Sequence, residues 1–258
     1  MRRCLILCLA LLAGLLAACQ ATTATPAALP SPTTTTAPVV VALPPALEPA
    51  VPALQTCARE LGVPLALLTA PQSREAPPAA NMRLWWGDAP PEGWQAYAVA
   101  EEQLVAITAR THTPDITADD LRRMIIGQRT TWEADAATPV PLALWLPLPE
   151  SAEGQRLMAW LGTAPLRGDA ALAPTSETML KAVADDAAAL GFVPRGWLHT
   201  LHEGSPVHAL PLAAAPAAWQ APVLVLLPAD APPAAQALAG CLQQEPGEKV
   251  LRTVYPTP

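Results

Sequence analysis

The sequence is poor in the residues that recognise nucleic acids and in the arrangements that carry out catalysis. Its only lysines are Lys181 and Lys249, and no stripe of basic residues interleaved with aromatic ones is present. Binding to nucleic acid depends on basic groups that neutralise phosphates, so we do not expect nucleic acid as a partner. The sequence also lacks a Ser-His-Asp arrangement, a P-loop, a glycine-rich dinucleotide turn and an acidic metal cluster. We therefore expect no enzymatic activity and no cofactor.

Long apolar runs are missing everywhere except at the N-terminus. Residues 4–16 form an uncharged run that is too short to span a bilayer but has the length of a signal-peptide core. The run follows two arginines and ends in Leu16-Ala17-Ala18-Cys19, which resembles the bacterial lipobox. We expect residues 1–18 to be a signal peptide and Cys19 to carry a lipid such as palmitate. The alternative is an ordinary secretory signal in which Cys19 is incidental.

Charged residues are absent from residues 19–38, which consist mainly of Ala, Thr and Pro. Such a segment cannot bury enough apolar area to offset its ordering entropy, so we expect a flexible tether before a folded body over 39–258. Loss of the two arginines of the signal leaves 13 basic against 22 acidic residues, a net charge of −9. A negative body repels anionic lipid heads, so the lipid would hold an extracytoplasmic monomer to the periplasmic or outer membrane surface.

Few cysteines remain after export. Cys4 and Cys8 leave with the signal peptide and Cys19 is acylated, which leaves Cys57 and Cys241. An even pair in an oxidising compartment favours a disulfide. Two separate buried thiols are the alternative.

Strand and helix patterns alternate along the body. Strands are expected at 39–43, 65–68, 83–86, 104–108, 142–146, 191–193, 207–212 and 223–227. Helices are expected at 47–61, from a capping box of Thr117 and Asp120 to Gly127, from Ser151 to Gly162, at 176–190 and at 232–243. This alternation predicts an α/β fold with mixed, mostly parallel sheets.

A series of motifs lies in order between residues 104 and 193. Residues 104–107 read Leu-Val-Ala-Ile, residues 116–128 hold the capping box and an Arg-Arg-Met-Ile-Ile-Gly-Gln run, and Thr131-Trp132 follows. Residues 175–179 read Thr-Ser-Glu-Thr-Met, and residues 188–193 read Ala-Ala-Leu-Gly-Phe-Val. This series resembles the phosphate-type periplasmic substrate-binding proteins.

The resemblance implies a fold, a partner and a disulfide position. Two α/β lobes would be joined by crossover strands around a ligand cleft and would close like a hinge. Lobe 1 would hold 39–107 and 196–258, and lobe 2 would hold 108–195. The first and last helices would then share lobe 1, where Cys57 and Cys241 could pair. An ABC permease would receive the cargo in a transport protein.

The sequence departs from this family where the anion should bind. The family holds phosphate with a Ser-Gly-Thr turn at a helix start. The matching segment, 149–156, keeps Ser151 and Gly154 but adds Glu150 and Glu153, whose carboxylates repel phosphate. If an anion binds, the best candidates are Ser151, Gly154, Arg156, Thr175 and Ser176. Alternatively, Ser151 only caps the helix and Arg156 is solvated.

Two further groups of residues invite functional interpretations. A metal site could use His199, His202, Glu203 and His208, but their spacing does not fit a zinc helix and Gly204 and Pro206 break any helix there. A polar surface loop, with no metal, is the simpler interpretation. Trp85 and Trp86 cannot face the same side of a strand, so one could line a cleft and contact an organic ligand.

We therefore expect a lipid-anchored, non-enzymatic solute-binding protein whose solute is a small molecule or anion of unknown identity. The alternative is an envelope interaction or sensor module on the same fold, because a fold alone does not decide function.

Overall fold

The computed structural model describes residues 37–255, except for 76, 112, 114 and 134–138. The chain divides into Met1–Thr35 and a compact unit, Thr36–Pro258. The signal peptide, Cys19 and nearly all of the tether lie outside the described residues. Within the described part of the chain, no helix is both long and apolar enough to cross a membrane.

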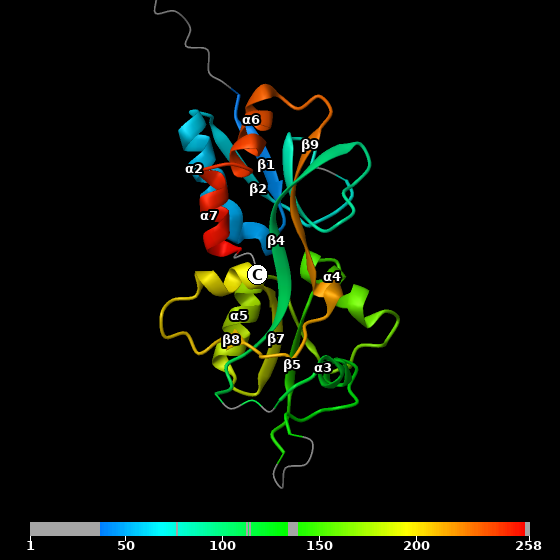
Figure 1. Ribbon diagram of the computed structural model, residues 1–258. Coiled ribbons are helices and arrows are strands. Elements are labelled where there is room, and N and C mark those ends of the chain that lie inside the picture. The colour runs from blue at the N-terminus through cyan, green and yellow to red at the C-terminus, as the bar shows by residue number, and fades with distance from the viewer. Residues whose placement is uncertain (1–36, 76, 112, 114, 134–138, 256–258) are drawn as a thin grey trace, which may run out of the picture. The chain divides into compact units, whose positions relative to one another are not determined.

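The compact unit contains one continuous sheet in the order β2-β1-β3-β9-β4-β7-β5-β6, with β8 beside β4 (Figure 1). Its strands are β1 (Val39–Leu43), β2 (Leu65–Thr69), β3 (Met82–Trp86), β4 (Trp94–Thr108), β5 (Ala143–Pro147), β6 (Ala171–Ala173), β7 (Ala189–Pro194), β8 (His208–Ala209) and β9 (Gln220–Pro228). The helices are α2 (Val51–Leu61), α3 (Ala118–Ile125), α4 (Ala152–Leu161), α5 (Ser176–Asp185), α6 (Pro233–Leu242) and α7 (Gly247–Val254). Three 3₁₀ segments, η1 (Pro45–Ala50), η2 (Arg195–Thr200) and η3 (Ala217–Trp219), complete the elements. This is the α/β architecture expected from the sequence.

Two long strands join the halves of the sheet. β1 pairs in parallel with β2 and β3 in the first half, and β5 pairs in parallel with β6 and β7 in the second. β4 and β9 pair antiparallel with their neighbours and with each other. Along β4, the segment from Trp94 to Gln103 pairs with β9 and the segment from Leu104 to Ile107 pairs with β7. β4 therefore passes from one half to the other between Gln103 and Leu104.

The division of the chain into lobes at residues 107/108 and 195/196 stays a prediction. The first of these positions lies at the end of β4 and the second lies within η2.

Tryptophans fill much of the interior. Trp86, Trp132 and Trp219 are among the largest fully buried side chains. The Trp219 ring lies edge-on to Trp160 and Phe192, with centroids 5.1 and 5.9 Å apart. Edge-to-face packing of this kind adds to the burial of apolar area, so Trp160, Phe192 and Trp219 stabilise the core.

The predicted capping box forms at the start of α3. The Asp120 amide donates to Thr117 Oγ1 at 3.1 Å, and the Thr117 amide donates to Asp120 Oδ2 at 3.1 Å. The Thr117 hydroxyl also donates to this carboxylate and is the main cause of its lowered pKa. Free amides at the helix start are thus satisfied within the helix itself.

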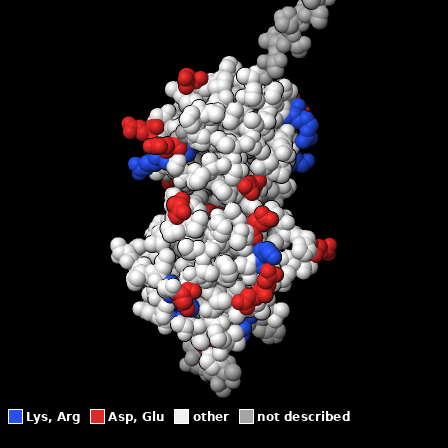
Figure 2. All heavy atoms as spheres, turned by 180° about the vertical axis from the view of Figure 1, so that it is seen from behind, with Lys and Arg blue, Asp and Glu red and all other residues white. Residues whose placement is uncertain are grey.

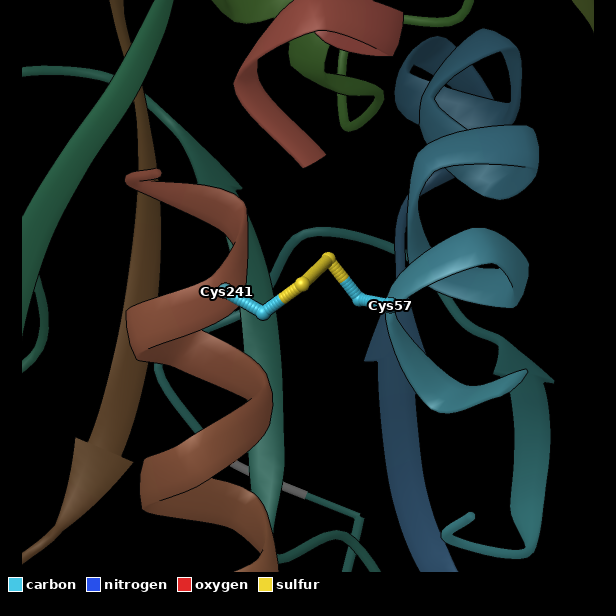
Figure 3. The surroundings of a disulfide bond; sticks show 2 residues. All are labelled: Cys57 and Cys241. Carbon is cyan, nitrogen blue, oxygen red and sulfur yellow. A yellow bond between two sulfur atoms is a disulfide. The ribbon is translucent and has the colours of Figure 1, made fainter. Parts of the chain in front are cut away.

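The predicted disulfide joins α2 to α6 (Figure 3). The Cα atoms of Cys57 and Cys241 are 5.8 Å apart and the two residues are separated by 184 positions. α7 packs against the same bond, because a Cβ on Gly247 would lie 2.5 Å from Cys57 Sγ. The bond therefore fastens the C-terminal segment to the first helix.

Several element boundaries differ from the sequence predictions. The expected helix 176–190 ends at Asp185, because Asp186 is extended and its carboxylate accepts a hydrogen bond from the Ala188 amide. The expected strand 207–212 is reduced to β8. The first part of β4 was not predicted, and neither were β6 and α7.

Candidate functional site

The first turns of α4 contribute to two separate hollows. The smaller hollow gathers three of the predicted site residues, Ser151, Thr175 and Ser176. The larger one contains Arg156, which projects from another face of the helix. The structure thus divides the predicted site in two.

The small hollow is nearly closed. Its volume is about 10 Å³, which is about the minimum that one water molecule requires. Besides the hydroxyl residues, its lining includes Glu153. A phosphate ion does not fit into it.

Each hydroxyl of the small hollow already has a partner inside the protein. Ser151 Oγ accepts from the Gly154 amide at 3.0 Å and donates to the Leu148 carbonyl at 2.8 Å. Thr175 Oγ1 accepts from the Thr178 amide at 3.2 Å. These serine and threonine contacts are helix caps, which stabilise α4 and α5 without any ligand.

Glu153 supplies the partner of the third hydroxyl. Its side chain lies among buried residues, with 5% of the residue exposed, and accepts a 2.8 Å hydrogen bond from Ser176 Oγ. Glu177, the next residue of α5, lies near another carboxylate: the pKa of Glu48 is raised, first by burial and then by the charge of Glu177. The hydroxyl group of Ser176 therefore already binds a carboxylate, in a neighbourhood that repels further anions.

Gly154 has a structural role in this arrangement. A Cβ at this position would lie 2.0 Å from the carbonyl oxygen of Leu148. The α4 helix can approach the end of β5 this closely only with glycine here. Gly154 therefore sets the position of the Ser151 cap and does not face the larger pocket.

The larger hollow has a volume of about 520 Å³, within the range of small-molecule sites. The β2–β3 loop forms one wall, the end of β3 another and α4 the third. Its lining residues are Gln72, Ser73, Arg74, Trp85, Trp86, Gly87, Asp88, Ala89, Ala152, Gln155, Arg156 and Ala159. The α4 members recur at intervals of three and four residues, so they share one face of the helix. We call this hollow the Arg156 pocket.

The Arg156 guanidinium is largely enclosed and weakly paired. Its side chain is 16% exposed, and Nη1 lies 3.6 Å from Asp88 Oδ2. Nη2 donates to the Trp86 carbonyl at 3.4 Å, a long hydrogen bond. The guanidinium carbon lies 5.8 Å from the centre of the Trp86 ring. Burial lowers the pKa of Arg156 and Asp88 raises it, but an arginine stays charged at any physiological pH. The group thus keeps donors available for an anion.

Gly87 allows this guanidinium to approach the backbone. Its φ of +152° lies in a region that L side chains rarely adopt, and a Cβ there would lie 2.6 Å from Arg156 Nη2. Any larger residue would push the guanidinium out of its place.

The wall opposite α4 is held by buried polar contacts. The Gln72 amide group forms two 2.9 Å hydrogen bonds with the Trp86 backbone, one to its carbonyl and one from its amide. Arg83 lies between the rings of Trp85 and Trp94, 5.4 Å from each centre, and donates to the Ser73 carbonyl. These contacts fix the β2–β3 loop. Gln72 and Arg74 were missed by sequence reasoning because the loop contains no recognisable motif.

The histidine-rich segment does not form a site. Among the described residues, no three His, Cys, Asp or Glu side chains come together as metal ligands would. His199 lies in η2, while His208 is exposed in β8 and contacts the Pro206 carbonyl through Nδ1 at 3.1 Å.

Charge is sparse on the surface. On the face shown in Figure 2, acidic and basic side chains form small separate clusters, and most of the surface is uncharged. This face therefore has no broad basic area of the kind that binds nucleic acid.

Comparison with known proteins identifies the fold. No protein-family model and no curated protein sequence matches the chain. Among solved structures, a phosphate ABC transporter substrate-binding protein from Clostridium perfringens, with bound phosphate, matches with a TM-score of 0.71 and 13% identity, covering 85% of this chain and 98% of the other. An ABC-type phosphate transport receptor from Vibrio cholerae gives 0.62 and 14%, covering 85% and 100%. A mutant OxyR2 regulatory domain from Vibrio vulnificus, bound to sulfate, gives 0.60 and 9%, covering 83% and 96%.

At such low identity these likenesses establish the fold and leave the function open. The chain has the two-lobed α/β fold of periplasmic binding proteins, as the sequence motifs predicted. The same fold serves in substrate-binding proteins of transporters and in regulatory domains.

Proposed function

We propose that this protein is an exported, lipid-anchored solute-binding protein, without enzymatic activity, which holds a small organic anion in the Arg156 pocket. The observation that carries the proposal is the enclosed, weakly paired guanidinium of Arg156 inside a pocket of about 520 Å³. The likeness in fold to substrate-binding proteins over 85% of the chain supports it. An ABC permease is the expected partner in transport.

The proposal places the anion away from the hydroxyl cluster of Ser151, Thr175 and Ser176. That cluster surrounds about 10 Å³, and its Ser176 hydroxyl already donates to Glu153. Arg156, by contrast, offers a planar set of donors that suits carboxylates and phosphate groups. Inorganic phosphate in the hydroxyl cluster is therefore not the ligand we propose.

A thermal-shift screen tests the proposal. The protein would be melted with phosphate, sulfate and a set of small carboxylates, each at several concentrations. A ligand present at a hundred times its Kd stabilises the folded state by about 2.7 kcal/mol, which is readily seen as a higher Tm. Arg156→Ala should abolish the shift, whereas Arg59→Ala, at an exposed site on α2, should leave it unchanged. If no anion raises the Tm of the wild-type protein, the proposed binding function is wrong.

The anchor is tested separately. Cys19→Ser should prevent labelling of the exported protein by a fatty-acid probe, because the thiol is the acceptor of the lipid. Normal labelling of this variant would contradict the anchor while leaving solute binding untouched.

A second candidate function is a sensor or interaction module of the cell envelope. It is favoured by the closed hydroxyl cluster and by the likeness to a regulatory domain. Under this function no permease is needed. A permease and an ATPase encoded beside this gene would favour transport, and their absence would favour the sensor.

A further inference from the structure

We propose that the Arg156 pocket recognises an organic dianion, with one carboxylate on Arg156 and the second on Arg74. This inference rests on the proposed function and names the class of its ligand. It arises from two arginines that line one pocket, each from a different segment of the chain.

The two arginines differ in a way that suits two successive contacts. Arg156 comes from α4, is largely enclosed and is held in place by the Trp86 ring and carbonyl. Arg74 comes from the β2–β3 loop, is exposed, and makes no hydrogen bond or ion pair with any residue that the structure describes. Arg156 is thus a fixed contact inside the pocket, and Arg74 is an exposed cation in its lining.

Asp88 forms only a weak ion pair with Arg156 and does not use up the hydrogen-bond donors of its guanidinium. Its side chain is 72% exposed and its carboxylate approaches Nη1 only to 3.6 Å. Exposed ion pairs contribute little, since water and salt screen them. A ligand carboxylate that forms two parallel hydrogen bonds with the guanidinium would displace this contact.

The rest of the lining is uncharged. Apart from Arg74, Arg156 and Asp88, it consists of glutamine, serine, tryptophan, glycine and alanine. The pocket therefore has a local positive charge in a protein whose overall charge is negative. Once Asp88 is displaced, two cations remain to balance two carboxylates.

The pocket has room for an organic linker and not only for a single inorganic ion. Ala152 and Ala159 keep the α4 wall flat, and Trp85 adds an aromatic edge. The Gln155 side chain on the same wall donates from Nε2 to the Gln72 carbonyl at 3.4 Å. A volume of about 520 Å³ greatly exceeds what a sulfate or phosphate ion fills. A short aliphatic chain with a carboxylate at each end would use both the cations and the apolar wall.

Isothermal titration calorimetry of the full-length, lipidated protein in detergent tests the inference. The probes are succinate and glutarate with two carboxylates, propionate with one, and sulfate as a compact dianion. We expect the better dicarboxylate to bind at least tenfold more tightly than propionate, the weight of one additional charge-assisted pair. We expect sulfate to bind no better than propionate, because a compact dianion presents its charge at one place and has no linker to contact the apolar wall.

Variants assign the two contacts. Arg74→Ala should remove the tenfold preference for the dicarboxylate, because the second carboxylate loses its partner. Arg74→Lys should recover part of it, since the charge is kept and the fork is lost. Arg156→Ala should weaken both probes, and Arg59→Ala on α2 should weaken neither.

The outcomes separate this inference from the proposed function. Equal affinity for succinate, glutarate and propionate, or a preference that survives Arg74→Ala, overturns the dianion. In that case binding of propionate or sulfate that still depends on Arg156 keeps the proposed function. Absence of binding by every anion overturns both.

Discussion

Glu102 lies at the point where β4 leaves the first half of the sheet for the second, and its replacement gives a quantitative test of the structure. The residue is 2% exposed. Its carboxylate accepts hydrogen bonds from the Gln103 amide at 2.7 Å and from the Gly196 amide at 3.1 Å. Burial raises its pKa from 4.5 to about 8, although the backbone amides of Gln103, Gly196 and Arg195 and the charge of Arg195 act in the opposite direction. Desolvation therefore outweighs the hydrogen bonds.

The sign of the pH effect follows from this raised value. Between pH 4.5 and about 8 the folded protein holds a proton on Glu102 that the unfolded chain has lost. The contribution of Glu102 to the free energy of unfolding is therefore fully present below pH 4.5 and is lost as the pH rises through this window. At about 1.4 kcal/mol per pH unit, the loss from this group is about 3 kcal/mol at pH 7 and about 5 kcal/mol at pH 9.

Glu102→Gln removes the titrating group and retains a side chain of the same size. Urea unfolding at pH 5, 7 and 9 would give the free energy of unfolding of the variant relative to the wild type. This difference should shift in favour of the variant by about 4 kcal/mol between pH 5 and pH 9. Glu101→Gln, at the exposed neighbour, should leave the pH profile of the wild type unchanged. Parallel profiles for Glu102→Gln and the wild type would refute the claim that Glu102 is protonated in the folded protein.

Three further predictions follow from single contacts and are all measured by urea unfolding. Gly196→Ala should destabilise the protein by about 1–3 kcal/mol, because a Cβ there would lie 2.8 Å from both Glu102 Oε2 and the Tyr255 ring. An unchanged midpoint of unfolding would contradict this close packing. Replacement of Cys57 and Cys241 by alanine should lower the free energy of unfolding by about 2–5 kcal/mol by opening a long loop. Reduction of the wild-type protein should reproduce this loss, and an unchanged free energy of unfolding after reduction would contradict the disulfide. Thr117→Ala should cost about 1 kcal/mol through loss of the cap on α3, a claim that fails if the variant is as stable as the wild type.

The fold was predictable where local chemistry specifies it. Alternating strand and helix patterns predicted the α/β class, and the Thr117–Asp120 capping box marked the start of α3. The disulfide was predictable because removal of the expected signal peptide and acylation of Cys19 would leave an even pair of cysteines. Its location was predictable only with the family resemblance, since the partners are 184 positions apart.

Elements whose stability comes from distant contacts were missed. The first part of β4 is largely exposed or half-buried, follows Gly93 and includes Gln95 and Glu101, so its sequence lacks a continuous apolar signal. It becomes a strand because it pairs with β9 along Trp94–Gln103, about 120 positions away. β6 has only three residues, which is too short for a pattern to be recognised in the sequence. α7 has eight residues and is stabilised by packing against the disulfide, a contact that the local sequence does not reveal.

The sequence predicted which kinds of residue belong to the candidate site, but not how they are arranged in space. The sequence places Ser151, Gly154 and Arg156 within one turn and a half of helix, so it cannot distinguish residues that share a face from those that do not until the register of α4 is known. In the structure Arg156 lines the larger pocket together with Ala152 and Ala159. Ser151 lines the small hollow together with the residues at the start of α5. The loop residues Gln72 and Arg74 reach the pocket only through tertiary packing.

The placement of Glu153 explains why an anion site in this chain would lie beside Arg156. A helix start attracts negative charge, and at α4 the side chain of Glu153 already provides it from the first turn. Its carboxylate also accepts a hydrogen bond from the Ser176 hydroxyl at the start of α5. The same internal carboxylate therefore provides negative charge at the starts of both helices. A solute anion at that place would have to displace a buried internal carboxylate. On the neighbouring face of α4, the Arg156 guanidinium contacts oxygen atoms of the described residues only at 3.4 and 3.6 Å. The internal carboxylate thus closes one site and leaves the guanidinium as the group with unused capacity for an anion.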